Sequence, residues 1–277
     1  MKGKYLFFCV IVLLVLGSCS KFRKLQKKGD WKEKYEAAIK YYERGGKKDY
    51  YKATVLLEDI LPIIRGTEYA EKAEFVYAYS YFRQGQHILS AHYFQNFSRT
   101  FSRSEFAEEA TFMYAYSLYL DSPIHSLDQS STYEAIEAMQ LFLNRYPSST
   151  FREQGNGIID DLQEKLEKKS YENSKQYFEL GQYKSAIVAF DNFRNQFPDS
   201  DYVEEMVYLK IDAQFKLAVN SIFSKKRERL LEAIELYEEY LDDFPDGAYL
   251  KRAERIYADS QNELVKLQRQ EITNSNF

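Results

Sequence analysis

The sequence predicts an all-α protein in which about five helix pairs follow one another along the chain. Five Pro and eleven Gly among 277 residues are few, which favours long helices. From about residue 30 onward, apolar residues recur at intervals of three and four, the spacing of one helix face. With 45% hydrophobic and 29% charged residues, the chain can bury a large core and is neither disordered nor a polytopic membrane protein.

The N-terminus has the pattern of an export signal. Two lysines precede a 12-residue apolar run at 5–16, which is too short to span a membrane comfortably and is typical of a signal-peptide core. The run Leu-Gly-Ser-Cys at 16–19 resembles a bacterial lipobox, in which the cysteine becomes the first mature residue and carries lipid. We therefore expect a lipoprotein signal peptide over 1–18 and lipidation at Cys19. The alternative is an ordinary signal peptide in which the cysteine occurs by chance.

Lipidation would leave the mature chain without a free thiol, because Cys9 is removed with the signal peptide. Cysteine nucleophiles and cysteine-containing metal sites are therefore excluded. Three acyl chains would hold the protein on a membrane essentially permanently. By analogy with bacterial lipoproteins, Ser20 in place of Asp directs the protein to the outer membrane.

Charge is unevenly distributed along the chain. Residues 21–34 hold seven Lys or Arg against Asp30 and Glu33, a net charge of +5, whereas the chain from Tyr35 onward has a net charge of −11. We expect residues 19–31, with the lipidated Cys19, to form a basic tether on anionic headgroups. No aromatic ladder or reading helix accompanies the basic residues, so no nucleic-acid partner is expected.

Five copies of one pattern fill the helical region. Each copy has a small residue, and the five small residues are Ala53, Ser90, Ala135, Ala186 and Ala233. Apolar residues follow four and seven positions later, namely Leu57 and Ile60, Phe94 and Phe97, Met139 and Phe142, Phe190 and Phe193, and Tyr237 and Tyr240. A spacing of four then three lies on one helix face, so these residues are the candidate core.

The ends of these helices are also marked in the sequence. Pro147, Pro198 and Pro245 stop the first helix of the last three copies. Thr67, Ser104 and Ser200 follow as candidate caps of the next helix. Acidic residues that suit the helix dipole come after them, namely Glu71, Glu108, Glu109, Glu204 and Glu205.

Helix pairs with small residues at the crossing and Pro at the exit resemble tetratricopeptide repeats, which implies a right-handed α-solenoid of about five tetratricopeptide-like helix pairs. The copies start at 48, 85, 130, 181 and 228, so each step exceeds the standard period of about 34. Residues 121–131 and 220–229 are predicted as loops within the third and fifth repeats. Residues 165–175 are predicted to continue a helix.

A lipobox, a short basic segment and long repeats with Tyr-Pro-Ser-Ser at 146–149 and Phe-Pro-Asp-Ser at 197–200 resemble the BamD family, lipoproteins of the outer-membrane β-barrel assembly machinery. The resemblance covers about residues 19–270. It also includes the run 63–69, with Arg-Gly-Thr-Glu-Tyr, and the aromatic helix 77–81.

The resemblance implies a non-enzymatic scaffold, lipid-anchored at the periplasmic face of the outer membrane. Its repeat domain would cover 32–270, followed by a tail at 271–277. The C-terminal repeats, 148–270, would bind a barrel-inserting BamA-type outer-membrane protein. The N-terminal repeats, 32–147, would capture the C-terminal signals of unfolded outer-membrane proteins.

Two sets of candidate binding residues follow. For a peptide that ends in an aromatic residue and a free carboxylate, aromatic walls and a cation are needed. The candidates are Arg65, Tyr77, Tyr81, Arg83 and Tyr114. The alternative for the tyrosines is packing between helices. For the BamA-type partner, the candidates are Lys226, Arg227, Arg229, Arg252 and Arg255, and the alternative is a solvated helix surface.

Catalytic chemistry is not indicated. His87 and His92 are five residues apart and do not share a helix face as a zinc pair four apart would. The adjacent pairs 160–161 and 242–243 are aspartates whose side chains diverge on a helix, whereas two catalytic carboxylates must face one substrate. We expect no catalytic residues, no metal and no cofactor other than the covalent lipid on Cys19.

A rival hypothesis is another lipid-anchored repeat protein, either a glycan-binding partner of an outer-membrane porin or a cell-wall coordinator. Glycan binders commonly use exposed Trp platforms. Trp31 is the one tryptophan and lies beside the basic segment, which disfavours the glycan hypothesis.

Overall fold

The computed structural model describes residues 21–275, and residues 1–20 and 276–277 lie outside the described residues. The signal peptide predicted over 1–18 and the lipidation of Cys19 fall outside the described residues and stay predictions. Within 21–275 every regular element is a helix and no strand occurs, so the predicted all-α class is confirmed.

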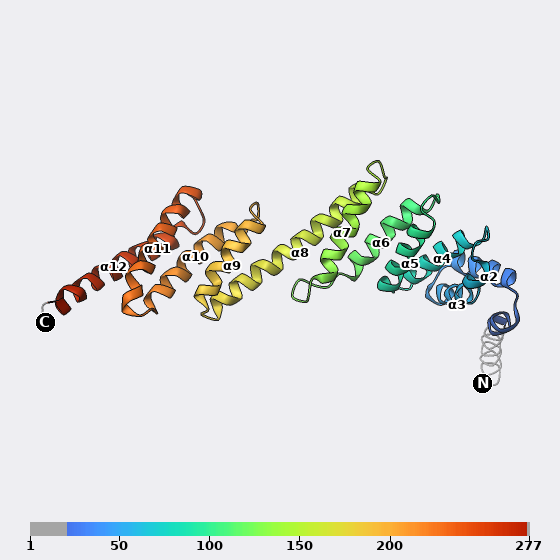
Figure 1. Cartoon of the computed structure of the whole chain (residues 1–277), viewed down its shortest axis with the longest axis horizontal. Helices are drawn as coiled ribbons and strands as arrows, with labels where there is room; N and C mark the ends of the chain where they lie inside the picture. The colour runs from blue at the N-terminus through green and yellow to red at the C-terminus, as the bar shows by residue number, and fades with distance from the viewer. Residues whose placement is uncertain (1–20, 276–277) are drawn as a thin grey trace, which may run out of the picture. The chain divides into compact units, whose positions relative to one another are not determined.

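The described chain begins with a helix over residues 21–28. The helices that follow are α2 (Trp31–Arg44), α3 (Lys47–Ile64), α4 (Ala70–Arg83), α5 (His87–Thr100), α6 (Ala107–Asp121), α7 (Ser130–Arg145), α8 (Arg152–Glu179), α9 (Tyr183–Gln196), α10 (Val203–Val219), α11 (Phe223–Asp243) and α12 (Leu250–Ser275). Figure 1 shows them in chain order, coloured from blue to red.

The chain divides into two compact units, with the boundary between Leu162 and Gln163 inside α8. In unit 1 each helix from α2 to α7 packs against the next along the chain, and in unit 2 the same holds from α9 to α12 (Figure 1). This succession is that of a helical repeat solenoid. The grouping of repeats at 32–147 and 148–270 stays a prediction.

Buried small residues let the two helices of each pair approach closely. The five small residues predicted for this role are all at most 1% exposed. The apolar residues four and seven positions later are buried as well, and among them only Tyr237 reaches 9% exposure. The repeat frame predicted from the sequence is therefore confirmed, because one register places the same positions at the crossing in every copy.

Hydroxyl residues bind the turns between helices, but not as predicted. The helices after Thr67, Ser104 and Ser200 begin three residues later, and none has a side-chain cap. Instead, Ser104 Oγ accepts from the Phe106 amide at 2.9 Å, and Ser200 Oγ accepts from the Tyr202 amide at 3.0 Å. Each hydroxyl therefore stabilises the turn that precedes the helix and does not cap the helix itself. The reason is that two residues of the turn lie between the hydroxyl residue and the first helical residue.

Tyrosine–carboxylate hydrogen bonds connect successive second helices of the pairs. The Tyr79 hydroxyl of α4 donates to Glu109 of α6, and the Tyr119 hydroxyl of α6 donates to Asp161 of α8 at 2.9 Å. In unit 2 the Tyr171 hydroxyl of α8 donates to Glu205 Oε2 of α10 at 2.8 Å. Two carboxylates that the sequence suggested for the helix dipole, Glu109 and Glu205, thus also join neighbouring repeats.

Lys175 completes this contact in unit 2. Its Nζ donates to Glu205 Oε1 at 2.9 Å and to the Tyr171 hydroxyl at 2.7 Å. Burial by itself would raise the pKa of Glu205, but the hydrogen bonds from Lys175 and Tyr171 outweigh burial and hold that pKa below its usual value. Glu205 is therefore ionised and paired at neutral pH.

The predicted loops are half correct. Residues 122–129 join α6 to α7, close to the predicted loop at 121–131, and the helix predicted at 165–175 lies inside α8. The loop predicted at 220–229 is wrong beyond residue 222, because α11 begins at Phe223. Lys225 pairs with Glu228 at 2.9 Å along this first turn, and Leu230 is buried, so the charged residues lie on the outer side of a helix.

The segment expected as a tether differs from that expectation. Residues 21–28 are helical, and Phe22 and Leu25 pack against the core of unit 1. The Phe22 ring meets the edge of the Tyr41 ring at 6.0 Å between centroids. Burial of these two apolar side chains explains why the basic segment folds onto the repeats. At the other end, α12 continues to Ser275, past the predicted start of the tail at 271.

We predict that Ala186→Leu destabilises unit 2 by about 1 to 3 kcal/mol, because the added side chain has no space at a fully buried crossing. Ala258→Leu is the matched control, since Ala258 is exposed on α12, and it should change stability by less than about 0.5 kcal/mol. Urea denaturation followed by far-ultraviolet circular dichroism measures both. Equal losses of stability in the two variants would mean that the helix crossing at Ala186 accommodates a larger side chain.

We also predict that Glu205→Gln destabilises unit 2 at pH 7 and that the difference from the native chain shrinks as the pH falls below about 4. A carboxyl whose pKa is lower in the folded state contributes stability above its unfolded pKa and loses it as the pH falls through the folded pKa. Urea midpoints at a series of pH values test this. A pH-independent difference would show that charge does not carry the contact.

Candidate functional site

Three tyrosines form a cluster between α4 and α5 in unit 1, called here the tyrosine cluster. The hydroxyls of Tyr77 and Tyr81 lie 3.2 Å apart, and the Tyr77 ring meets the edge of the Tyr93 ring at 4.7 Å. Tyr81 stacks on Tyr93 at 5.1 Å between centroids. The structure thus brings together two of the predicted peptide-binding residues and adds Tyr93, which the sequence analysis did not single out.

The members of the tyrosine cluster differ in exposure. Tyr77 is 4% exposed, whereas Tyr81 and Tyr93 are half-buried. Burial raises the pKa of Tyr77 first, and hydrogen bonds with its two tyrosine neighbours raise it further, so its hydroxyl stays protonated. Tyr77 therefore has the position of a packing residue, and the accessible part of the cluster belongs to Tyr81 and Tyr93.

The two predicted arginines are exposed but do not lie together at the tyrosine cluster. Arg65 follows the last residue of α3, and its charge acts on Glu74 of α4. Arg83 is the last residue of α4, and its charge acts on Tyr79 and Tyr42. Tyr79 lies about 200° around α4 from Tyr77, so Arg83 belongs to the other face of this helix.

Tyr114 of α6 lies apart from the tyrosine cluster and is half-buried. Burial raises its pKa, with further increases from Glu134 and Glu137 of α7 and decreases from Arg99 and Gln95 of α5. Within residues 21–275 no ring contact joins Tyr114 to the cluster. The structure therefore separates the predicted peptide-binding set into the tyrosine cluster, Tyr114 and two single arginines, and their role in peptide binding stays a prediction.

The predicted partner residues of unit 2 fall into two groups. Lys226, Arg227 and Arg229 lie in the first two turns of α11. Arg227 pairs with Glu271 of α12 at 3.2 Å, and the Arg229 guanidinium donates to the Ser221 hydroxyl. Two of the three residues of this first group are therefore engaged in contacts within unit 2, and Arg227 is the one that pairs with a carboxylate.

The second group, Arg252 and Arg255, is on α12 and exposed. The Arg252 guanidinium lies 5.6 Å from the Tyr249 ring centre, and Tyr249 stacks on Tyr208 at 5.1 Å. Burial and Asp212 raise the pKa of Tyr208, and the charges of both arginines lower it. In the part of the chain that the structure describes, neither arginine forms an ion pair.

The first group, on α11, and the second group, on α12, lie near opposite ends of this helix pair, because α11 and α12 are antiparallel. Arg227 contacts Glu271, while Tyr237 packs against Tyr257 at 4.6 Å. Arg255 precedes Glu271 by sixteen residues, about 24 Å along a helix. The five basic residues therefore do not make one continuous patch, and their role at a partner interface stays a prediction.

Two of the three histidines, His87 and His92, have structural contacts. His87 packs edge-on against Phe82 at 5.4 Å, and His92 Nε2 lies 2.9 Å from Asn96 Nδ2. Among residues 21–275 no three His, Cys, Asp or Glu side chains gather in a way that could hold a metal ion. Over the same residues, no helix combines the length and apolar character that crossing a membrane requires.

Sequence reasoning missed Tyr93, Tyr208 and Tyr249 as neighbours of the predicted residues. Tyr93 lies one position before Phe94, so the repeat pattern places it next to a core residue. Tyr249 directly precedes α12. The stacking that brings Tyr249 to Tyr208 joins α10 to the start of α12, a contact that the spacing within one helix cannot indicate.

Comparison with protein families gives one finding that bears on these sites. A family model described as YfiO, outer membrane lipoprotein, matches residues 27–188. The match covers more than half of the chain, including the tyrosine cluster and Tyr114, and ends before Arg252 and Arg255. No curated protein matches the chain.

We predict that Tyr77→Ala destabilises unit 1 by about 3 kcal/mol or more, because it removes a buried ring, and that Tyr81→Ala costs less because Tyr81 is half-buried. Urea denaturation with hydrogen exchange of the α4 and α5 peptides measures both. A larger cost at Tyr81 would contradict the assigned burial.

Proposed function

The chain belongs to the YfiO family of outer membrane lipoproteins, and on that premise we propose that it is a non-enzymatic scaffold of β-barrel protein assembly at the periplasmic face of the outer membrane. The observation that carries the proposal is the family match over residues 27–188, which begins eight residues after a lipobox that ends in Cys19. Successive helix pairs support it, because stacked repeats offer a long surface for extended or folded partners.

Unit 2 is proposed to bind a barrel-inserting BamA-type protein. Arg252 and Arg255 are the best candidates, because they are exposed and free of ion pairs within the described residues, and they flank the Tyr208–Tyr249 stack. Aromatic residues and Arg are enriched at protein interfaces. Charges at the rim of an interface mainly set the association rate and the register.

Unit 1 is proposed to capture the C-terminal signals of unfolded outer-membrane proteins. The half-buried rings of Tyr81 and Tyr93 supply an aromatic surface for a terminal aromatic side chain. Arg65, Arg83 and Tyr114 are the remaining candidates, and they lie outside the tyrosine cluster. Glu58 lies close enough to Tyr81 to raise its pKa, so the peptide carboxylate would have to approach from the side away from Glu58.

The test is to purify the intact lipoprotein from envelopes of the organism that produces it, in mild detergent, and to identify its partners by mass spectrometry. Recovery of a BamA-type protein is the expected result. Recovery of a porin with glycan enzymes, or of cell-wall proteins, would keep the fold and reject this function. Trp31 disfavours the glycan outcome, because its ring is half-buried against the edge of Tyr69 at 5.3 Å.

We predict that Arg252→Glu with Arg255→Glu lowers recovery of the BamA-type partner about tenfold or more, with helicity unchanged. Lys47→Glu with Lys48→Glu is the matched control, since both lysines are exposed in unit 1. Arg227→Glu with Arg229→Glu tests the other group separately. If the α12 variant recovers as much partner as the native chain, the interface lies elsewhere.

A further inference from the structure

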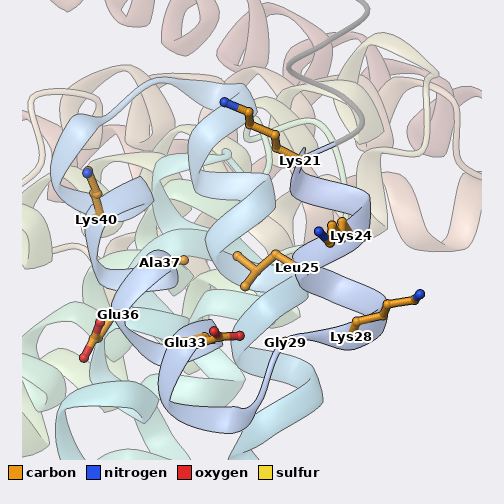
Figure 2. Close-up of a pocket in the computed structure, with 9 residues that line it drawn as sticks. All are labelled: Lys21, Lys24, Leu25, Lys28, Gly29, Glu33, Glu36, Ala37 and Lys40. Carbon is orange, nitrogen blue, oxygen red and sulfur yellow. The ribbon is translucent and has the colours of Figure 1, made fainter.

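A groove runs between the helix at residues 21–28 and α2, at the N-terminal end of the described chain (Figure 2). It encloses about 660 Å³. Four lysines line it, three from the first helix and one from α2, namely Lys21, Lys24, Lys28 and Lys40. Leu25 and Ala37 form an apolar strip between the two helices, and Figure 2 shows Leu25 directed from the first helix toward α2.

Lysines outnumber carboxylates in this groove by four to two. Within residues 21–275 none of the four forms an ion pair, whereas Lys34 on α2 pairs with Asp59 at 3.1 Å. Two carboxylates of α2, Glu33 and Glu36, also line the groove, so its lining has a net charge of +2. Glu33 accepts from the Asp30 amide at 3.3 Å in the capping box of α2. In Figure 2 the ammonium groups of Lys21 and Lys40 lie on the side of the groove away from Glu33.

Packing holds the two sides of the groove together. Phe22 and Leu25 lie against the core of unit 1. The chain then turns at Gly29, whose amide donates to the Leu25 carbonyl at 2.8 Å, and a Cβ at Gly29 would lie 2.6 Å from that oxygen. Asp30 caps α2 directly after this turn. The lysines of the first helix and Lys40 of α2 therefore stay in one place relative to each other.

The position of the groove indicates which ligand it meets. Lys21 follows the predicted lipid-bearing Cys19 by two residues, which span at most about 7 Å of chain. Lys24 lies one helical turn further on, about 4.5 Å along the axis. Acyl chains on Cys19 would thus hold the groove at the depth of the lipid headgroups, within about one Debye length of their charge.

We propose that this groove binds the phosphates of anionic phospholipid headgroups in the leaflet that holds the lipid on Cys19. Ammonium groups suit phosphate oxygens, and the apolar strip of Leu25 and Ala37 can accept the glycerol end of the lipid. Unit 1 then contacts the membrane surface through residues of two helices and is not connected to it by a flexible segment alone. The proposal depends on the lipoprotein assignment and not on the barrel-assembly partners.

The test uses the intact lipoprotein in nanodiscs of phosphatidylcholine, with and without phosphatidylglycerol. Lysines are acetylated under limiting reagent, and the rate at each lysine is read by peptide mass spectrometry. Lys24, Lys28 and Lys40 should react about fivefold more slowly in the discs that contain phosphatidylglycerol. The protection should disappear in about 0.5 M NaCl, where the Debye length falls to about 4 Å. Lys72, exposed on α4, is the control lysine.

Lys40 distinguishes a groove from a tether, because it lies on α2, far from Cys19 in sequence. Protection of Lys24 and Lys28 without Lys40 would overturn the proposal in favour of a tether. Equal rates in both kinds of disc would also overturn it. Protection by inorganic phosphate in phosphatidylcholine discs alone would show a free-ion site and not a membrane site.

A variant pair makes the test stricter. If lysines of both helices bind the same headgroups, Lys24→Glu with Lys28→Glu should abolish the protection of Lys40. Lys72→Glu should leave that protection intact. Retained protection in the double variant would overturn the shared groove. The mass of the N-terminal peptide reports the lipid on Cys19 separately, so failure of the lipoprotein assignment is distinguishable from failure of the groove.

Discussion

The close crossing of paired helices at small buried residues is the constraint on which the rest of the structure depends. Ala53, Ser90, Ala135, Ala186 and Ala233 are at most 1% exposed. Their small size lets the large side chains one and two turns later meet the neighbouring helices and fill the cores of the two units. Once this register is fixed, the exposed faces that remain for partners are fixed too.

Polar contacts then join one repeat to the next. The hydroxyls of Tyr79, Tyr119 and Tyr171 each bind a carboxylate on the following second helix. Ser200 donates from its turn to Glu167 of α8 at 2.5 Å, which connects the turn to the preceding helix. Hydrogen bonds to charged groups contribute about 1.5 to 3 kcal/mol when shielded and less when exposed. They fix the relation of adjacent repeats more than they add to total stability.

The sequence predicts the repeat frame well because its cause is local. A small residue followed by apolar residues at four and seven positions describes one helix face, and every copy repeats it. The failures have non-local causes. Residues 223–229 were predicted as loop because none of them is buried, and the first buried residue of α11 is Leu230. The helix at 21–28 was predicted as a tether because its two apolar residues, Phe22 and Leu25, are buried by residues of other helices, such as Tyr41 of α2.

The candidate sites show the same limit. Tyr77 and Tyr81 share a helix face in sequence, but their different depths depend on Tyr93, which comes from another helix. The five basic residues of unit 2 seemed one surface, but antiparallel packing of α11 and α12 puts Arg227 and Arg255 at different ends of it. Contacts within one helix were predictable, and contacts between helices were not.

The chain is a succession of helix pairs, and in the part that the structure describes no group of residues is arranged to hold a metal ion. The most direct measurement of its role is depletion of the protein from living cells, followed by quantitative proteomics of the outer membrane. The account predicts that many unrelated β-barrel proteins decrease together, while lipoproteins of the same membrane persist. A loss confined to one porin and its glycan enzymes, or a defect in the cell wall with normal barrel proteins, would contradict it.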